Sequence, residues 1–217
     1  MNTYLTIQEQ KEKVEITTNI KSNENIDKDK LNATIKQISK FIKKNKRNKK
    51  EVIINTELDL EKDEKKDNQM LTLIAALNAC KVKDKKQRIE YLYMSACKYL
   101  DNEFINKNIC EFKDDVCLGK RKYNIKNGCC HEFKMKNVLY PKNLPLCKYQ
   151  KDKHCIADCL GCKVFVCDAV RKKGYKYTYY NVPLIRYFFN IKQKIIIRCS
   201  VFTHKDGILK KLYFFDF

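Results

Sequence analysis

The chain has 217 residues, a formal net charge of +20 and a hydrophobic content of 44%, which together predict a folded soluble protein with one sizeable core or two small ones. Its longest apolar run, Met70 to Cys80, is too short to span a bilayer, so the sequence predicts no transmembrane segment. The first ten residues contain neither the basic nor the apolar region of a secretory signal, and we therefore expect the protein in a reducing cytoplasm.

Residues 1–60 predict a small α/β unit. Val14 and Ile16 alternate with charged neighbours, which indicates a short strand. A polar stretch follows and ends in acidic residues of the kind that begin a helix. Beyond it, apolar residues recur at helical spacing: Leu31, Ile35, Ile38 and Ile42. Residues 51–60 return to strand alternation, and residues 61–69 are charged and polar, which marks a linker.

Residues 70–217 predict a helical domain around a cysteine-rich module at about 108–170. Helical spacing runs through 70–80 and about 84–104, and it places Cys80 and Cys97 on apolar faces as buried structural thiols. The module lacks periodicity, and a loop-rich segment of this length needs cross-linking. One amphipathic helix is predicted from Pro183 to Cys199, and a capping motif at 203–206 predicts a last helix. The predicted fold class is therefore α+β.

Ten of the twelve cysteines lie between Cys97 and Cys167, which predicts a concentrated thiol site. In a reducing compartment such a cluster binds metal or does redox chemistry more often than it forms disulfides, although disulfides and unligated thiols stay open as alternatives. The predicted metal ligands are Cys129, Cys130, Cys147, Cys155, Cys159, Cys162 and Cys167. His131 and His154 border these cysteines and are alternative ligands, although surface histidines are the commoner case.

The spacing of the cysteines bears on the metal. Cys155, Cys159 and Cys162 follow one another at x3 and x2 spacing, which suits three corners of a cubane cluster with Cys147 or Cys167 as the fourth. A structural zinc site usually has two Cys-x2-Cys steps, and this run has one. The spacing favours an iron–sulfur cluster over Zn²⁺ and leaves both open.

Two known families have related motifs. The x3–x2 spacing resembles the cluster motif of radical S-adenosylmethionine enzymes, but Gly161 stands where that family usually has an aromatic residue, and only 55 residues follow Cys162. We therefore reject that activity. Gly128-Cys129-Cys130-His131, with the cysteines that follow, resembles small bacterial cysteine-rich proteins described as zinc- or iron-chelating, over about residues 117–171. This resemblance implies metal binding and no specific activity.

The basic charge is concentrated in the cysteine-bearing part, because residues 1–69 carry 16 basic and 13 acidic residues and residues 70–217 carry 30 and 13. This excess fits a patch for nucleic acid or another polyanion, or a cationic surround for thiolate–metal centres. The candidate contacts are Arg171, Lys172, Lys173, Tyr175, Lys176 and Tyr177, where tyrosine rings would stack on unpaired bases. The alternative that we favour is an amphipathic strand whose tyrosines pack on the core.

No hydrolase, phosphate-binding or zinc-protease motif is present, so the sequence identifies no catalytic residue. The function that it predicts is metal binding in an intracellular cysteine-rich protein, with electron transfer or redox sensing if the metal is iron. The alternative is a zinc-stabilised nucleic-acid-binding module that uses the basic, aromatic segment.

Overall fold

The structure is a computed structural model, and it describes residues 4–21, 27–45, 50–60, 67–110, 112–113, 116–117, 150–151, 154–155, 157–164, 166, 168–200 and 203–215. The chain divides into two compact units. Unit 1 consists of Met1–Ser95 and Pro183–Asn190, and unit 2 consists of Ala96–Val182 and Ile191–Phe217. The boundaries predicted from the sequence, 1–60, 61–69 and 70–217, divide the chain differently and stay predictions.

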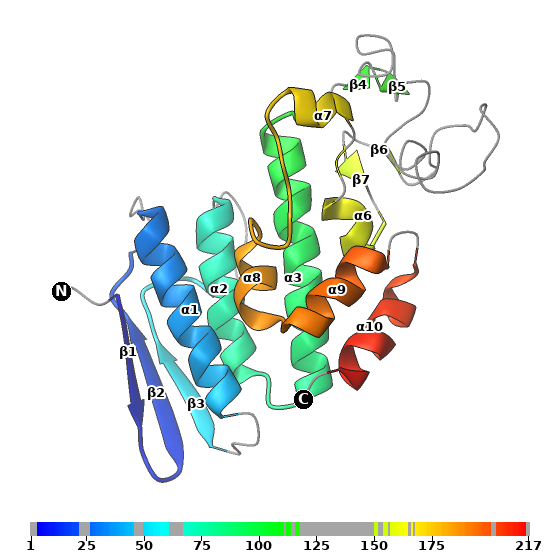
Figure 1. Cartoon of the computed structure of the whole chain (residues 1–217). Helices are drawn as coiled ribbons and strands as arrows, with labels where there is room; N and C mark the ends of the chain where they lie inside the picture. Colours follow the sequence, from blue (N-terminus) through cyan, green and yellow to red (C-terminus); the bar gives the residue numbers. More distant parts are fainter. Residues whose placement is uncertain are drawn as a thin grey trace. The chain divides into compact units, whose positions relative to one another are not determined.

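Unit 1 contains a three-stranded sheet in the order β1-β2-β3 (Figure 1). Its strands are β1 (Leu5–Glu9), β2 (Lys13–Thr18) and β3 (Glu51–Asn55). β1 and β2 form an antiparallel hairpin, whereas β2 and β3 are parallel, so the chain crosses over between them through helix α1 (Lys28–Lys44). Alternate residues of β2 are buried, which follows from its alternating apolar pattern.

The helices of unit 1 are α1, α2 (Asn68–Lys81), the first half of α3 (Lys85–Asn106) and α8 (Pro183–Phe188). Asp27 caps α1 by accepting hydrogen bonds from the backbone N–H groups of Asp29 and Lys30, both at 3.0 Å. The four isoleucines and leucines that the sequence placed on one face of α1 are buried. α1 packs on α2 and α8, and α2 also contacts β3.

Unit 2 is built from the second half of α3 and from α6 (Leu160–Val164), α7 (Asp168–Lys172), α9 (Ile191–Cys199) and α10 (Lys205–Phe214). α9 packs on both α6 and α10. Two short antiparallel hairpins also belong to this unit: β4 (Phe112–Lys113) with β5 (Val116–Cys117), and β6 (Gln150–Lys151) with β7 (His154–Cys155).

The α+β class is confirmed: the structure combines a small three-stranded N-terminal sheet with several helices. Most of the predicted cysteine-rich module, about 108–170, lies outside the described residues, so that part of the prediction stays a prediction. Strand β1 was not predicted, and its burial explains why, since only Leu5 of its five residues is buried and the alternation is weak. Across the described ranges, no helix has the length and apolar character needed to cross a membrane.

The single helix predicted from Pro183 to Cys199 is wrong. The helix stops after Phe188, and α9 begins afresh at Ile191. The break changes the rotational phase of everything that follows, because a new helix need not continue the face of the old one. Ile191, Ile195 and Cys199, which the pattern placed on the inner face, are exposed, while Gln193 and Ile197 are buried.

Candidate functional site

The structure describes the side chains of two of the seven predicted metal ligands, Cys159 and Cys162. Cys155 lies on strand β7, with only its backbone described. The remaining four, Cys129, Cys130, Cys147 and Cys167, lie outside the described residues, as does His131.

Cys159 and Cys162 meet at the first turn of α6. Cys159 directly precedes the helix and Cys162 is its third residue, and two residues three apart lie on the same side of a helical turn. The backbone N–H of Cys162 donates a hydrogen bond to Sγ of Cys159 at 3.4 Å. This contact fixes the position of the Cys159 sulfur relative to the second half of the Cys-x2-Cys step.

Cys159 is buried, at 4% exposure, and Cys162 is partly exposed. The Cys159 thiol donates a hydrogen bond to the backbone carbonyl oxygen of Ser200 at 3.2 Å, which ties the start of α6 to the residue that follows α9. In its thiol form, Cys159 therefore accepts a hydrogen bond from the Cys162 N–H and donates one to the Ser200 carbonyl oxygen.

A buried ion pair stands beside these thiols. Lys163 follows Cys162 in α6 and is only 4% exposed, and its Nζ lies 2.5 Å from Oδ1 of Asp101 on α3. Cys97 precedes Asp101 by one helical turn on α3 and is also buried. Burial raises the pKa of the Cys97 thiol, and the positive charge of Lys163 partly opposes this shift. The acidic groups of Asp101, Asp158 and Cys159 raise this pKa further, so the turn before α6 lies near Cys97 of α3.

The helical spacing of the sequence predicted Cys97 and Cys80 to be buried, and the structure confirms that both are. It missed Asp101 and Lys163. A signal was available for Asp101, because it lies four residues after Cys97 on the same helical face. Lys163 carried no such signal, since a lysine in a basic chain is expected at the surface.

No three His, Cys, Asp or Glu side chains within the described ranges lie close enough together to hold a metal ion. A centre that uses Cys159 and Cys162 therefore needs ligands from the cysteines that the structure does not describe. His204 is not one of the candidates, because it caps α10: its Nδ1 accepts a hydrogen bond from the Asp206 backbone N–H at 3.5 Å.

In the basic, aromatic segment 171–180, α7 ends at Lys172, and residues 175–178 belong to no helix and to no strand among the described residues. Its exposure nevertheless alternates, with Tyr175, Tyr177 and Tyr179 more buried than the residues between them. Tyr175 and Tyr177 pack against an apolar cluster made of Ile109, Val166 and Val170. Tyr175 and Tyr177 thus pack on the core, as the favoured alternative predicted, whereas Tyr179 contacts the ring of Tyr180.

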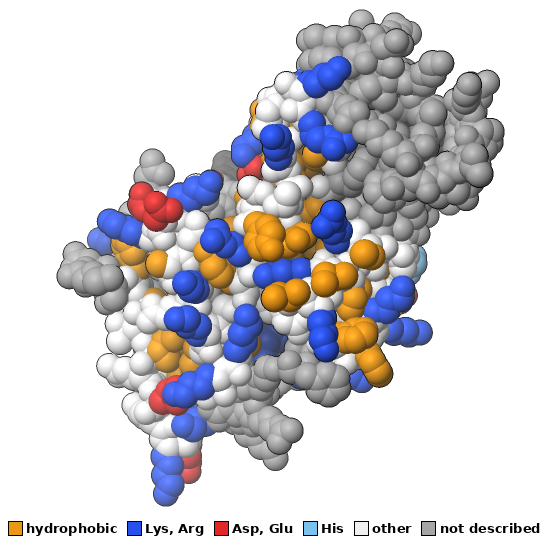
Figure 2. All heavy atoms as spheres, in the orientation of Figure 1, with side chains coloured by type: hydrophobic (Ala, Val, Ile, Leu, Met, Phe, Trp, Pro, Cys, Tyr) orange, Lys and Arg blue, Asp and Glu red, His pale blue; other side chains and the backbone are white. Residues whose placement is uncertain are grey.

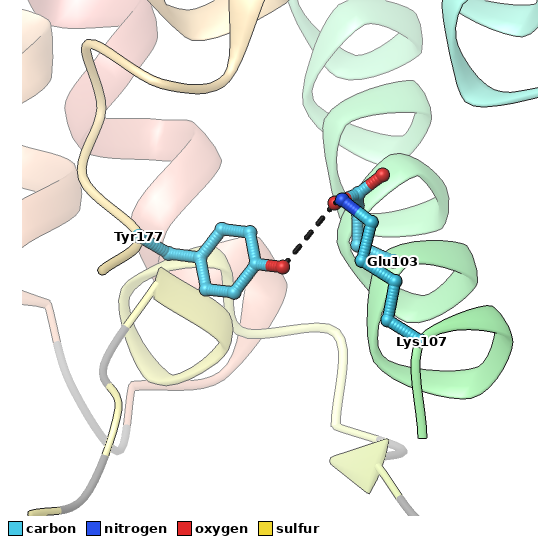
Figure 3. Close-up of polar contacts among 3 residues, drawn as sticks. All are labelled: Glu103, Lys107 and Tyr177. Atoms are coloured by element: carbon cyan, nitrogen blue, oxygen red, sulfur yellow. Dashed lines mark hydrogen bonds and ion pairs between the residues drawn. The ribbon is translucent and has the colours of Figure 1, made fainter. Parts of the chain in front are cut away.

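Tyr177 is held in place by helix α3 (Figure 3). Its hydroxyl donates a hydrogen bond to Oε2 of Glu103 at 3.2 Å, and the same carboxylate oxygen pairs with the Lys107 amine one turn along the helix. The Tyr177 ring packs on Phe104 with a centroid separation of 5.3 Å. Burial, and then the neighbouring Glu103 carboxylate, raise the pKa of the Tyr177 hydroxyl well above its usual value.

The basic side chains of the segment differ in their exposure. Arg171, Lys172 and Lys176 are exposed, whereas Lys173 is partly buried and donates from Nζ to the backbone carbonyl oxygen of Ile109 at 3.1 Å. Stacking of nucleic-acid bases on Tyr175 and Tyr177 would require those rings to leave the core. The exposed cations keep the ability to contact phosphates.

No family model matches the sequence, and no curated protein or solved structure is significantly similar to it. The resemblance to zinc- or iron-chelating proteins therefore stays a prediction, and the function has to be argued from the residues themselves.

Proposed function

We propose that this protein binds a metal through cysteine thiolates, with Cys159 and Cys162 as two of the ligands and further ligands from the cysteines at 129, 130, 147, 155 and 167. The observation that carries the proposal is the hydrogen bond from the Cys162 N–H to Sγ of Cys159. This bond places the Cys159 sulfur against the backbone of Cys162 in a helical turn, and residues three apart in such a turn lie near one side of it, which supports a shared centre.

The surroundings of the two cysteines suit thiolates. A metal binds the deprotonated sulfur, and backbone N–H donors and nearby cations stabilise the negative charge that results. The Cys162 N–H supplies the first to the Cys159 sulfur. The cation nearest in sequence is Lys163, whose ammonium pairs with Asp101. Sulfur ligands select zinc or an iron–sulfur cluster over magnesium or calcium. An iron–sulfur cluster would supply electron transfer or redox sensing, and zinc would supply structural support.

Metal binding at Cys159 would change the contact to α9. The thiol proton now lies on the hydrogen bond to the Ser200 carbonyl, and a ligand sulfur has to release that proton. The carbonyl would then lose its donor. We therefore expect the residues between α9 and α10 to respond to the metal content of the protein.

The proposal is tested by metal analysis of the full-length chain purified without oxygen, together with an absorbance spectrum and an assay for acid-labile sulfide. Iron with sulfide and a brown colour would identify a cluster, and stoichiometric zinc without colour would identify a zinc site. Cys159→Ser and Cys162→Ser should each lose at least half of the bound metal, because each removes a ligand.

The matched control is Cys199→Ser, which replaces an exposed cysteine on α9 and should keep the full metal content. Wild-type protein that carries neither metal would contradict the proposal. So would Cys159→Ser and Cys162→Ser proteins that bind as much metal as Cys199→Ser.

A further inference from the structure

Helix α9 presents an apolar surface to solvent. Ile191 is 75% exposed and Ile195, one turn later on the same side, is 55% exposed. Tyr180, which precedes α8, is 60% exposed, and Phe214 at the end of α10 is 70% exposed. These four large hydrophobic side chains all belong to unit 2. Single exposed hydrophobic residues are common, but a contiguous apolar patch marks an interaction site.

Lysines of α9 lie against aromatic rings on two sides of this surface. Nζ of Lys194 lies 5.9 Å from the centroid of the Tyr180 ring, and Nζ of Lys192 lies 5.9 Å from the centroid of the Phe215 ring. Phe215 in turn contacts Phe214 edge to face, with a centroid separation of 5.0 Å. Hydrophobic and basic side chains are therefore interleaved over α9 and α10 (Figure 2).

The charge of the surrounding chain is mainly of one sign. Residues 169–205 contain nine lysines and arginines and no aspartate or glutamate. The next residue, Asp206 on α10, is acidic and exposed, so the field around α9 is mainly, but not wholly, positive. This excess of positive charge favours an anionic partner.

The apolar side chains decide which anionic partner fits. A nucleic acid offers phosphates to the lysines and stacking faces to an aromatic ring, but nothing complementary to Ile191 and Ile195. A protein partner needs a pocket in register with each side chain. The interface of a lipid bilayer accepts aliphatic and aromatic side chains in any register, while lysine stems lie along the apolar boundary and their amines reach the headgroup phosphates.

We propose that Tyr180, Ile191, Ile195 and Phe214, together with Lys192 and Lys194, form a surface that binds anionic lipid membranes peripherally. We call it the α9 surface. The isoleucines and the aromatic rings insert at the headgroup boundary, and the lysines bind the negative charge of the lipids. The surface uses none of the predicted metal ligands, so this inference is independent of metal binding.

The test is sedimentation of the full-length protein with vesicles of phosphatidylcholine, with and without phosphatidylserine. We expect binding to the vesicles that contain phosphatidylserine, little binding to phosphatidylcholine alone, and weaker binding as salt is added. Ile191→Ser with Ile195→Ser should lower the apparent affinity about tenfold or more, since both side chains are exposed in the free protein and lose only membrane contacts.

Charge is tested separately. Lys192→Gln with Lys194→Gln should lower the affinity about tenfold, at about 1 kcal/mol for each lysine near an anionic surface. The matched control is Lys36→Gln with Lys40→Gln, which removes the same charge from exposed positions of α1 in unit 1 and should change the affinity much less.

Three outcomes would overturn the proposal. The first is no sedimentation with phosphatidylserine vesicles at low salt. The second is an equal loss in the α9 and α1 lysine variants with no effect of the isoleucine variant, which would reduce the binding to net charge alone. The third is an isoleucine-dependent association with a single-stranded oligonucleotide or with a second copy of the chain, and none with vesicles.

Discussion

In unit 1 the polar side chains that the described core encloses are hydroxyls, whereas unit 2 encloses a carboxylate, an amine and an amide. The buried polar residues of unit 1 are Thr18, Thr34, Ser39 and Thr72, and those of unit 2 are Glu103, Lys163, Gln193 and Ser200. A buried hydroxyl needs one hydrogen bond, but a buried charge needs a charged partner as well. Unit 2 therefore depends on charged partners, which the four buried hydroxyls of unit 1 do not need.

The units also differ in how far along the chain the partners of these side chains lie. Unit 1 mixes the two kinds: Thr34 and Thr72 each donate to the carbonyl oxygen four residues earlier, at 3.0 and 2.6 Å. Ser39 donates to the carbonyl oxygen of Tyr187, 148 residues away, and Thr18 pairs with Thr56, 38 residues away. In unit 2, Lys163 pairs with Asp101, 62 residues away, and Tyr177 donates to Glu103, 74 residues away. The local bonds form whenever the helix forms, whereas the long-range bonds form only when the tertiary fold is correct.

The largest effect that we expect comes from a cavity in the apolar core of unit 1. Ile38→Ala should lower the free energy of unfolding by about 4 kcal/mol, because the Ile38 side chain on α1 is fully buried and its truncation leaves a cavity. Urea denaturation measures this loss, and Ile38→Val should lose only about 1 kcal/mol. Hydrogen exchange should accelerate in β2, α1 and α2. Equal acceleration in α6 and α9 would contradict the difference between the units.

The next effect tests the buried charge of unit 2. Asp101→Ala should cost about 3 kcal/mol, because it leaves the Lys163 ammonium buried without its partner. The double variant Asp101→Ala with Lys163→Met should recover most of that loss, since it removes the charge as well. Urea denaturation of the two proteins gives the comparison. A double variant as unstable as the single one would show that packing, and not charge, sets the cost.

The smallest effect belongs to the Tyr177 hydroxyl. Tyr177→Phe should cost about 1 kcal/mol at neutral pH, because one hydrogen bond to Glu103 is lost while the Lys107 pair stays. The pKa of this hydroxyl is raised in the folded protein, so its contribution is present below pH about 10 and is lost as the pH rises above that value. The variant should therefore lose less stability than wild type between neutral pH and pH about 11, as followed by denaturation at each pH. If the free energy of unfolding fell equally with pH in the variant and in wild type, the pairing with Glu103 would be contradicted.

The sequence predicted the regular parts of unit 1 because they follow from local periodicity. The strand at β2 and the helix at α1 are visible in the spacing of a few apolar residues. The short helix α6, which brings Cys159 and Cys162 onto one turn, was not predicted, because this stretch has no apolar periodicity. The break before α9 was not predicted, because Phe189 and Asn190 carry no helix-breaking signal as strong as proline. The burial of Lys163 and its pairing with Asp101 could not be predicted either, since both depend on which helices pack together.

The enclosed ammonium of Lys163 has a practical consequence for chemistry on the folded protein. Amine-reactive reagents modify lysines in proportion to their exposure and to the fraction of free amine, and an enclosed ammonium paired with a carboxylate offers little of either. Exposed lysines such as Lys36 and Lys176 should therefore be modified early, and Lys163 only when α6 separates from α3. The rate at which this side chain is labelled, measured by peptide mass spectrometry, would report how often unit 2 opens.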